Sequence, residues 1–447
     1  MNQSCTPLRP QIGLFALSNP LEVGADRASK TVEEMAALFR DKGCEVVLTG
    51  CINSAQTAAA SGRACAEKHI HAAVFAPVSW FEDYLALDFL EECSVPFLFR
   101  PLPGMETGAL CGTQQLTCFL KQLEHPCHTV FGETNHPQCL GDSMTFLRAA
   151  ALKHRLRRVR IGLAGHRVNG MTHTSANEFM LKKTIGPRII HLDLPEMLQQ
   201  ASSIPEKEAA DIWNAFRSKA SKCEVSASSG IDSMRMHLAI RKEIERHQLD
   251  ALAIGCYPQL MGRVCLSASL LADEGIPLAC EGDVHGAVAQ LILTLLSGTP
   301  THNTDWLDPL EDGSVVFTHC GSGSLSLAEK QDDIRISSVR LMGQGACALF
   351  PSRPGPVTLL DFIPHPDGYQ CALMGGEALP TQMVFPGNPL RVRFPQSPKQ
   401  LIDWIHREGI GHHWMAAHGH WSEELRHWRQ MTGKNLKWTE PENKIPA

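Results

Sequence analysis

Residues 11–17 read Gln-Ile-Gly-Leu-Phe-Ala-Leu, a short apolar run that is typical of a buried β-strand. A helical pattern of apolar residues follows at 32–39, and two further strand candidates lie at 45–49 and 72–76. Gly43 supplies a helix stop between the first helical pattern and the strand after it. Strands that alternate with helices in this way predict a parallel sheet with helices on its faces.

The same alternation begins again near residue 159. Strand candidates lie at 159–164, 188–192 and 251–254, and helical stretches lie between them at 177–184, 206–221 and 233–247. Beyond about residue 300, Pro and Gly separate short β-type runs at 314–318, 357–362 and 390–394. A strand candidate at 414–417 and a helical stretch at 422–430 follow near the C-terminus. We therefore expect an α/β fold with an N-terminal α/β domain (1–155), a second α/β domain (156–290) and a mostly β C-terminal domain (291–447).

The charge balance narrows the class of partner. The chain of 447 residues has 41 basic and 47 acidic side chains, a net charge of -6, and no basic block, so we expect neither nucleic acid nor a membrane surface as partner. No apolar run approaches eighteen residues and no leader-like start is visible, which favours a cytoplasmic location. The sixteen cysteines form no Cys-x-x-Cys pair, so we expect reduced thiols rather than disulfides or a structural zinc site.

The most informative polar segment is residues 279–286, Ala-Cys-Glu-Gly-Asp-Val-His-Gly, which follows an apolar run. If the segment is extended, Glu281, Asp283 and His285 lie on one face and converge on one point. Carboxylates with an imidazole suit Mn²⁺, Mg²⁺ or a similar divalent ion. The alternative is that the carboxylates cap a helix that begins near Gly286, with His285 as a helix-entry residue.

Three other polar segments follow apolar strands, where ligands bind in α/β proteins: 256–259 (Cys-Tyr-Pro-Gln), 318–323 (Thr-His-Cys-Gly-Ser-Gly) and 411–414 (Gly-His-His-Trp). His319, in the second segment, is a candidate ligand or a hydrogen-bonded structural residue. The sequence has no P-loop, no Gly-x-Ser-x-Gly elbow and no strand-linked Gly-x-Gly-x-x-Gly. Most nucleotide-dependent and serine-hydrolase functions are thereby excluded.

Four histidines, His412, His413, His418 and His420, lie within nine residues near the C-terminus. In an extended segment His412 and His418 face one way and His413 the other, so only part of the group can serve one site. We expect one metal ligand here, with solvated histidines on a strand edge as the alternative.

The order of these motifs resembles the L-fucose isomerase and L-arabinose isomerase superfamily. The resemblance rests on Asp-Ala-Leu-Ala-Ile-Gly-Cys-Tyr-Pro-Gln-Leu (250–260), Leu-Ala-Asp-Glu-Gly-Ile-Pro-Leu-Ala-Cys-Glu-Gly-Asp-Val-His-Gly-Ala (271–287), Thr-His-Cys-Gly (318–321) and His-His-Trp (412–414). It implies two Rossmann-like domains before a mostly β domain, and a Mn²⁺-dependent aldose-ketose isomerase that forms trimers or hexamers. It also implies metal ligands at Gln259, Asp283 and His413, while His319 matches a ligand of the arabinose isomerase branch.

One position departs from the superfamily, because a glutamate that binds metal and moves a proton is replaced by Gln259. An amide oxygen can coordinate a cation but cannot accept a proton at a useful pH, so we assign the proton transfer to Glu281, and Asp283 serves as ligand and second carboxylate. The lost negative charge would favour an anionic sugar, with Arg167 and Arg263 as candidate anion binders.

The function predicted from the sequence is therefore the isomerisation of an aldose, with a sugar as the partner and Mn²⁺ or another divalent cation as cofactor. Candidate substrate-binding residues are Tyr257, Arg167, His412 and His420. Two alternatives stay open: a lyase or epimerase that uses the same enediol chemistry, and a non-catalytic sugar-binding or regulatory protein.

Overall fold

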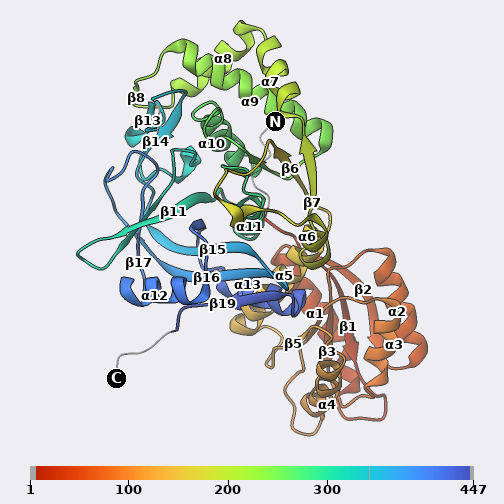
Figure 1. Cartoon of the computed structure of the whole chain (residues 1–447). Helices are drawn as coiled ribbons and strands as arrows, with labels where there is room; N and C mark the ends of the chain where they lie inside the picture. The colour runs from red at the N-terminus through yellow and green to blue at the C-terminus, as the bar shows by residue number, and fades with distance from the viewer. Residues whose placement is uncertain (1–6, 342, 443–447) are drawn as a thin grey trace. The chain divides into compact units, whose positions relative to one another are not determined.

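A computed structural model describes residues 7–341 and 343–442, which form two compact units. The N-terminal unit comprises residues 8–155 together with the segment 423–432, and the main unit comprises residue 7, residues 156–422 and residues 433–442. Each unit is described by itself below, with the elements labelled as in Figure 1.

The N-terminal unit is built on a five-stranded parallel sheet in the order β2-β1-β3-β4-β5. Its strands are β1 (Gln11–Leu17), β2 (Glu45–Ile52), β3 (Ala72–Pro77), β4 (Phe97–Phe99) and β5 (Cys127–Thr129). The helices are α1 (Ala28–Asp41), α2 (Ala55–Glu67), α3 (Tyr84–Glu92), α4 (Ala109–Gln122), α5 (Pro137–Leu156) and, from the distant C-terminal segment, α13 (Ser422–Thr432). Strand β1 and strand β3 are buried almost throughout, as their apolar sequences predict.

The main unit begins with a second parallel sheet in the order β10-β9-β6-β7. Its strands are β6 (Arg160–Ala164), β7 (Arg188–Leu192), β9 (Ala251–Ile254) and β10 (Leu278–Ala279). The accompanying helices are α6 (Glu178–Thr184), α7 (Leu194–Ser203), α8 (Glu206–Arg217), α9 (Ala227–His247), α10 (Cys265–Asp273) and α11 (Val284–Ser297).

A second sheet of the main unit closes on itself. Its strands run in the order β15-β18-β11-β12-β17-β16-β19, and β15 also pairs with β16, so six of the strands form a ring. They are β11 (His302–Pro309), β12 (Val315–Thr318), β15 (Gly355–His365), β16 (Gly368–Leu379), β17 (Leu390–Arg393), β18 (His413–His418) and β19 (Leu436–Thr439). Closure removes the unpaired edges that an open sheet would expose.

Helix α11 lies between the two sheets of the main unit and contacts β9, β15 and β18. Nearly every residue of the helix is buried, because the sequence Val-His-Gly-Ala-Val-Ala-Gln-Leu-Ile-Leu is apolar on all sides. The N-terminus of α11 therefore opens at the junction of the parallel sheet and the closed sheet. Glu281, Asp283 and His413, three of the polar residues singled out in the sequence, lie together at this junction.

The remaining elements of the main unit are a small sheet of β8 (Lys222–Cys223), β13 (Arg335–Ser337) and β14 (Cys347–Leu349), and helix α12 (Pro398–Glu408). The predicted fold class is confirmed: parallel α/β sheets precede a mostly β region. The division of residues 156–447 into two domains stays a prediction. Among the described residues, no helix combines the length and apolar character needed to cross a membrane.

Candidate active site

The segment 279–286 turns sharply instead of extending. Strand β10 ends at Ala279, Glu281 and Gly282 adopt left-handed conformations with φ of 64° and 70°, and helix α11 begins at Val284. A Cβ atom at position 282 would lie 2.6 Å from the backbone oxygen of His166, so only glycine fits there. The prediction that alternation along a strand directs Glu281, Asp283 and His285 to one face is therefore wrong, because a turn separates them.

Asp283 is the N-cap of α11, as the alternative interpretation of the segment predicted. Its Oδ1 accepts a hydrogen bond from the backbone N–H of His285 at 3.0 Å. Its other carboxylate oxygen, Oδ2, lies 2.8 Å from Nδ1 of His413, and the Asp283 side chain is 5% exposed. One buried carboxylate thus caps the start of the helix and orients a histidine of the closed sheet.

His413 and Asp305 are brought together by strand pairing. In the antiparallel register of β11 and β18, Asp305 lies opposite His413, and in that of β11 and β12 it lies opposite Thr318, the residue before His319. Side chains of directly opposed residues project from the same face of the sheet. Strand β11 therefore carries a carboxylate between His413 of β18 and the end of β12, which His319 follows directly.

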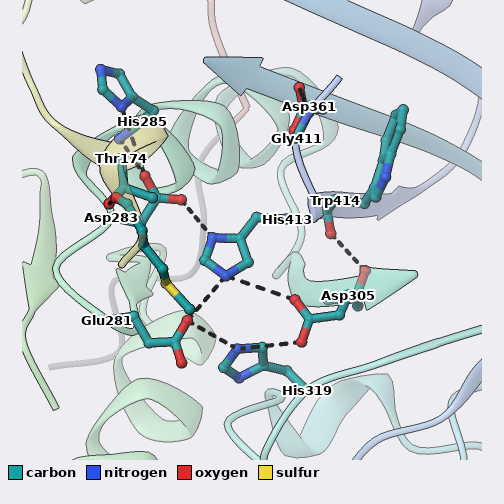
Figure 2. A network of polar contacts seen from close by, with 12 residues as sticks. Thr174, Glu281, Asp283, His285, Asp305, His319, Asp361, Gly411, His413 and Trp414 are labelled. Carbon is teal, nitrogen blue, oxygen red and sulfur yellow. Dashed lines mark hydrogen bonds and ion pairs between the residues drawn. The ribbon is translucent and has the colours of Figure 1, made fainter. Parts of the chain in front are cut away.

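Two carboxylates and two imidazoles converge as a result (Figure 2). Nε2 of His413 lies 3.1 Å from Oε2 of Glu281 and 3.7 Å from Oδ1 of Asp305. Nε2 of His319 lies 4.0 Å from the same glutamate oxygen and 3.9 Å from Oδ2 of Asp305. We call Glu281, Asp305, His319 and His413 the four-residue cluster.

The sulfur atoms of two cysteines contact Glu281 and His319 of the cluster. The backbone N–H of Glu281 donates to Sγ of Cys256 at 3.4 Å, and Nδ1 of His319 lies 3.1 Å from Sγ of Cys320. The Nδ1 contact leaves Nε2 of His319 directed at the carboxylates. The cysteines of residues 7–341 and 343–442 are free thiols in this structure.

The charges of the cluster stabilise one another. Burial disfavours the charged form of His413, but hydrogen bonds with Asp283 and Glu281 outweigh it and raise the histidine pKa well above its ordinary value. Burial likewise acts to raise the pKa values of Glu281 and Asp283, yet the hydrogen bonds with His413 lower both below their ordinary values. Glu281 and Asp283 are therefore ionised at neutral pH and attract a cation.

The four-residue cluster fits a divalent metal ion. Ligand atoms bound at 2.0–2.3 Å to one ion lie about 3 to 3.5 Å from each other, and the separations above are close to this spacing. Candidate ligand atoms of Glu281, His319 and His413 lie within 4.8 Å of one another, as do those of Asp305, His412 and His413. Oδ1 of Asp305 is buried without a hydrogen-bond partner among the described residues, which leaves it available to a cation.

A cavity of about 230 Å³ opens onto the cluster. Glu281, Asp305 and His319 line it together with Tyr257 and Arg340, and the rest of its wall is largely apolar. Asp283 is not among the lining residues, because it lies behind His413. The cavity combines a mostly apolar wall with a few converging polar groups, as small-molecule sites generally do.

The remaining residues singled out in the sequence lie in different places. Tyr257 lines the cavity, whereas Gln259, in the turn after β9, is exposed and does not line it. His412 is exposed beside His413, with the two ring centroids 4.1 Å apart. His420 is exposed and lies outside the cavity wall.

The two arginines predicted to bind an anion, Arg167 and Arg263, do not line the cavity. Arg263 forms a two-pronged ion pair with Asp232 at 2.7 and 3.1 Å, and Nη1 of Arg167 donates to the backbone oxygen of Val168 at 3.1 Å. His285 is 1% exposed and packs against aromatic side chains, as expected of a helix-entry residue. Burial lowers its pKa to about 4, so it is neutral.

Two acidic residues of this region were not predicted. Asp305 lies within the polar sequence His-Asn-Thr-Asp-Trp, which does not stand at the end of an apolar strand, so its position depends on strand register. Asp361 of β15 is 1% exposed and accepts a hydrogen bond from the N–H of Gly411 at 3.3 Å. Burial, reinforced by the charge of Asp283, raises its pKa to about 8.

Comparison with known proteins finds similarity to several sulfoquinovose isomerases. No model of a protein family matches the chain. The chain is 26% identical over 334 residues to a sulfoquinovose isomerase of Priestia aryabhattai, which is 72% of this chain and 73% of that protein. It is 25% identical over 332 residues to that of Alkalicoccus urumqiensis (72% and 74%), and 26% identical over 305 residues to that of a Clostridium species, strain MSTE9 (66% and 68%). The chain is an isomerase enzyme of the aldose-ketose kind, and its four-residue cluster is the candidate active site.

Proposed function

We propose that this chain is a metal-dependent isomerase that converts an anionic aldose into its 2-ketose, and that it is a member of the L-fucose and L-arabinose isomerase superfamily. The observation that carries the proposal is the convergence of Glu281, Asp305, His319 and His413, the first three of which line one cavity. The similarity to several sulfoquinovose isomerases supports both the reaction and the class of sugar.

The four-residue cluster would hold the metal ion. Two carboxylates and two imidazoles are a donor set that suits Mn²⁺, and also Zn²⁺ or Fe²⁺. When bound, the ion polarises the oxygens on C1 and C2 of the open-chain sugar and makes the C2 proton more acidic. Gln259 stays a predicted ligand, one that its exposed turn would have to bring to the ion.

Glu281 is the residue that we assign to proton transfer. Its carboxylate faces the cavity, is ionised at neutral pH and sits on a rigid turn fixed by Cys256. The carboxylate takes the proton from C2, the C–H electrons form the C1=C2 bond of an enediolate as the C1=O π electrons move to O1, and the same proton is returned to C1. Loss of the O2 proton to O1 completes the ketone at C2.

Asp283 is a positioning residue that acts on His413 and does not touch the sugar. Its carboxylate orients His413 by accepting a hydrogen bond from Nδ1, and Nε2, which lies 3.1 Å from Oε2 of Glu281, faces the centre of the cluster, where the cation would bind. Asp283 was predicted as a direct metal ligand. We now propose that it acts through His413.

The substrate that we propose is a sulfonated aldose such as sulfoquinovose. The proposal rests on the relatives, which are sulfoquinovose isomerases at 25–26% identity. A homo-oligomeric assembly and a cytoplasmic location remain predictions from the sequence.

The test is to incubate the purified protein with Mn²⁺ and sulfoquinovose in D₂O and to follow the sugar by NMR. We expect the 2-ketose to form, with deuterium entering C1 if the proton on Glu281 exchanges with solvent. Shorter fragments would indicate a lyase, and an aldose inverted at C2 an epimerase. Tight metal binding without turnover of any sugar would indicate a non-catalytic binding protein.

A further inference from the structure

The cavity wall contains one side chain whose charge the proposed chemistry does not use. Among the described residues that line the cavity, Arg340 carries the permanent positive charge, whereas Glu281 and Asp305 are the acidic ones. Arg340 lies in the loop between β13 and β14, outside the strands that hold the metal cluster. We propose that Arg340 is the anion subsite of this enzyme and selects sugars that carry a sulfonate or a similar oxyanion, an inference that rests on the proposed function.

The surroundings of Arg340 hold its guanidinium ready for a ligand. Its Cζ lies over the ring of Phe385, 4.9 Å from the ring centroid, and Phe385 also lines the cavity. Stacking on an aromatic face orders a guanidinium but leaves its N–H edges available. Less conformational entropy is then lost when an anion binds, so the stacked arrangement favours affinity.

Arg340 also has no competing anion. Within residues 7–341 and 343–442, no carboxylate forms an ion pair with it and no hydrogen bond engages its N–H groups. The arginines predicted from the sequence differ in this respect, since Arg263 is bound to Asp232 and neither it nor Arg167 lines the cavity.

The chemistry of the guanidinium matches a sulfonate. Its planar array of N–H donors can pair with two oxygens of a tetrahedral oxyanion at once, which a lysine ammonium cannot do with the same geometry. The carboxylates of the cavity repel an anion, so a sulfonated sugar needs a compensating cation away from the four-residue cluster. Arg340 supplies that charge on the wall of the same cavity.

The experiment compares kcat/KM for sulfoquinovose and for D-glucose, which carries a hydroxyl in place of the sulfonate, in the Mn²⁺-loaded wild type, R340Q and R340K. We expect R340Q to lose on the order of 10- to 100-fold on sulfoquinovose, mainly through KM, because it forfeits charge-assisted hydrogen bonds. Turnover of glucose should change less than about twofold, and R340K should recover part of the loss. R393Q is the matched control, since Arg393 is exposed, pairs with Asp312 and does not line the cavity.

The outcomes separate this inference from the proposed function. Equal losses on both sugars, or no loss on either, would overturn the role of Arg340 while leaving the isomerase intact. A wild type that turns over no sugar would overturn the proposed function. In that case, calorimetric titration of wild type and R340Q with sulfoquinovose still decides the subsite, and equal dissociation constants would refute it.

Discussion

Replacing Asp283 by asparagine or alanine separates the roles that the structure gives to this carboxylate. One oxygen caps α11 through the N–H of His285, and the other binds Nδ1 of His413. Asparagine is as good an N-cap as aspartate and its amide oxygen can still accept from Nδ1, but it carries no charge. Alanine can do neither.

The magnitudes follow from these contacts. Asp283→Asn weakens one hydrogen bond to a charged group, so we expect the free energy of unfolding to fall by about 1 to 2 kcal/mol. Asp283→Ala also removes the cap, worth about 1 kcal/mol, and leaves a buried ring nitrogen unsatisfied, for a total of roughly 3 to 4 kcal/mol. Because Asp283 acts on the metal through His413, asparagine should weaken Mn²⁺ affinity or turnover by about 10- to 100-fold.

The assay combines urea unfolding, Mn²⁺ titration and turnover of sulfoquinovose. Asp193 offers a matched control, since it caps α7 by accepting the N–H of Glu196 at 2.9 Å and has no histidine partner among the described residues. Asp193→Asn and Asp193→Ala should show the cap effect on stability alone, with Mn²⁺ affinity unchanged.

Either of two results would refute this reasoning about Asp283. Complete loss of metal binding in the asparagine variant would mean that Asp283 is a direct ligand. A loss of less than threefold, with the same stability pattern as at Asp193, would mean that it is only a helix cap.

Three further predictions address the rest of the site. Asp305→Asn should reduce Mn²⁺ affinity at least tenfold in a metal titration, because it removes a charged ligand. The metal-free protein should be as stable or slightly more stable, because one of three neighbouring carboxylate charges is lost. Unchanged affinity would remove Asp305 from the ligand set. Asp361→Asn should raise the free energy of unfolding by up to about 4 kcal/mol at pH 7 but by less than about 1 kcal/mol at pH 4. The reason is that the unfolded acid ionises near pH 3.8 and the folded one only near pH 8, so the wild type loses stability as the pH rises between these values. Urea titrations at the two pH values would show an equal effect if the carboxyl were ionised in the folded protein. Removing the metal with a chelator should lower the melting temperature, and adding it back should restore it. An ion present at about 100 times its dissociation constant adds roughly 3 kcal/mol to the free energy of unfolding. A melting temperature that changes in neither step would argue against a bound ion.

Much of the fold is visible in local sequence patterns. The apolar runs that become β1, β3 and β9 are short, continuous and buried along nearly their whole length, and parallel strands covered on both faces require this pattern. Helix α9 begins six residues before the predicted start at residue 233, because Ser226 caps it through the N–H of Ser229, a signal that periodicity alone does not contain.

The site is only partly visible in the sequence. Glu281, His319 and His413 were singled out because each follows an apolar strand or stands at a strand end, and the structure does bring them together. Asp305 was missed, since nothing local reveals which residue of β11 pairs with His413. The turn at Glu281 was missed as well, because a left-handed non-glycine residue is set by tertiary contacts rather than by propensity.

The central claim is that a metal ion at the four-residue cluster supports isomerisation. The most direct measurement is the rate of ketose formation from sulfoquinovose as metal-stripped protein is titrated with Mn²⁺. We predict a rate near zero without metal, a linear rise to a plateau at one ion per chain, and no rise in His413→Asn or Glu281→Gln protein that remains folded. Full turnover by the stripped wild type, or a normal rise in both variants, would contradict the account.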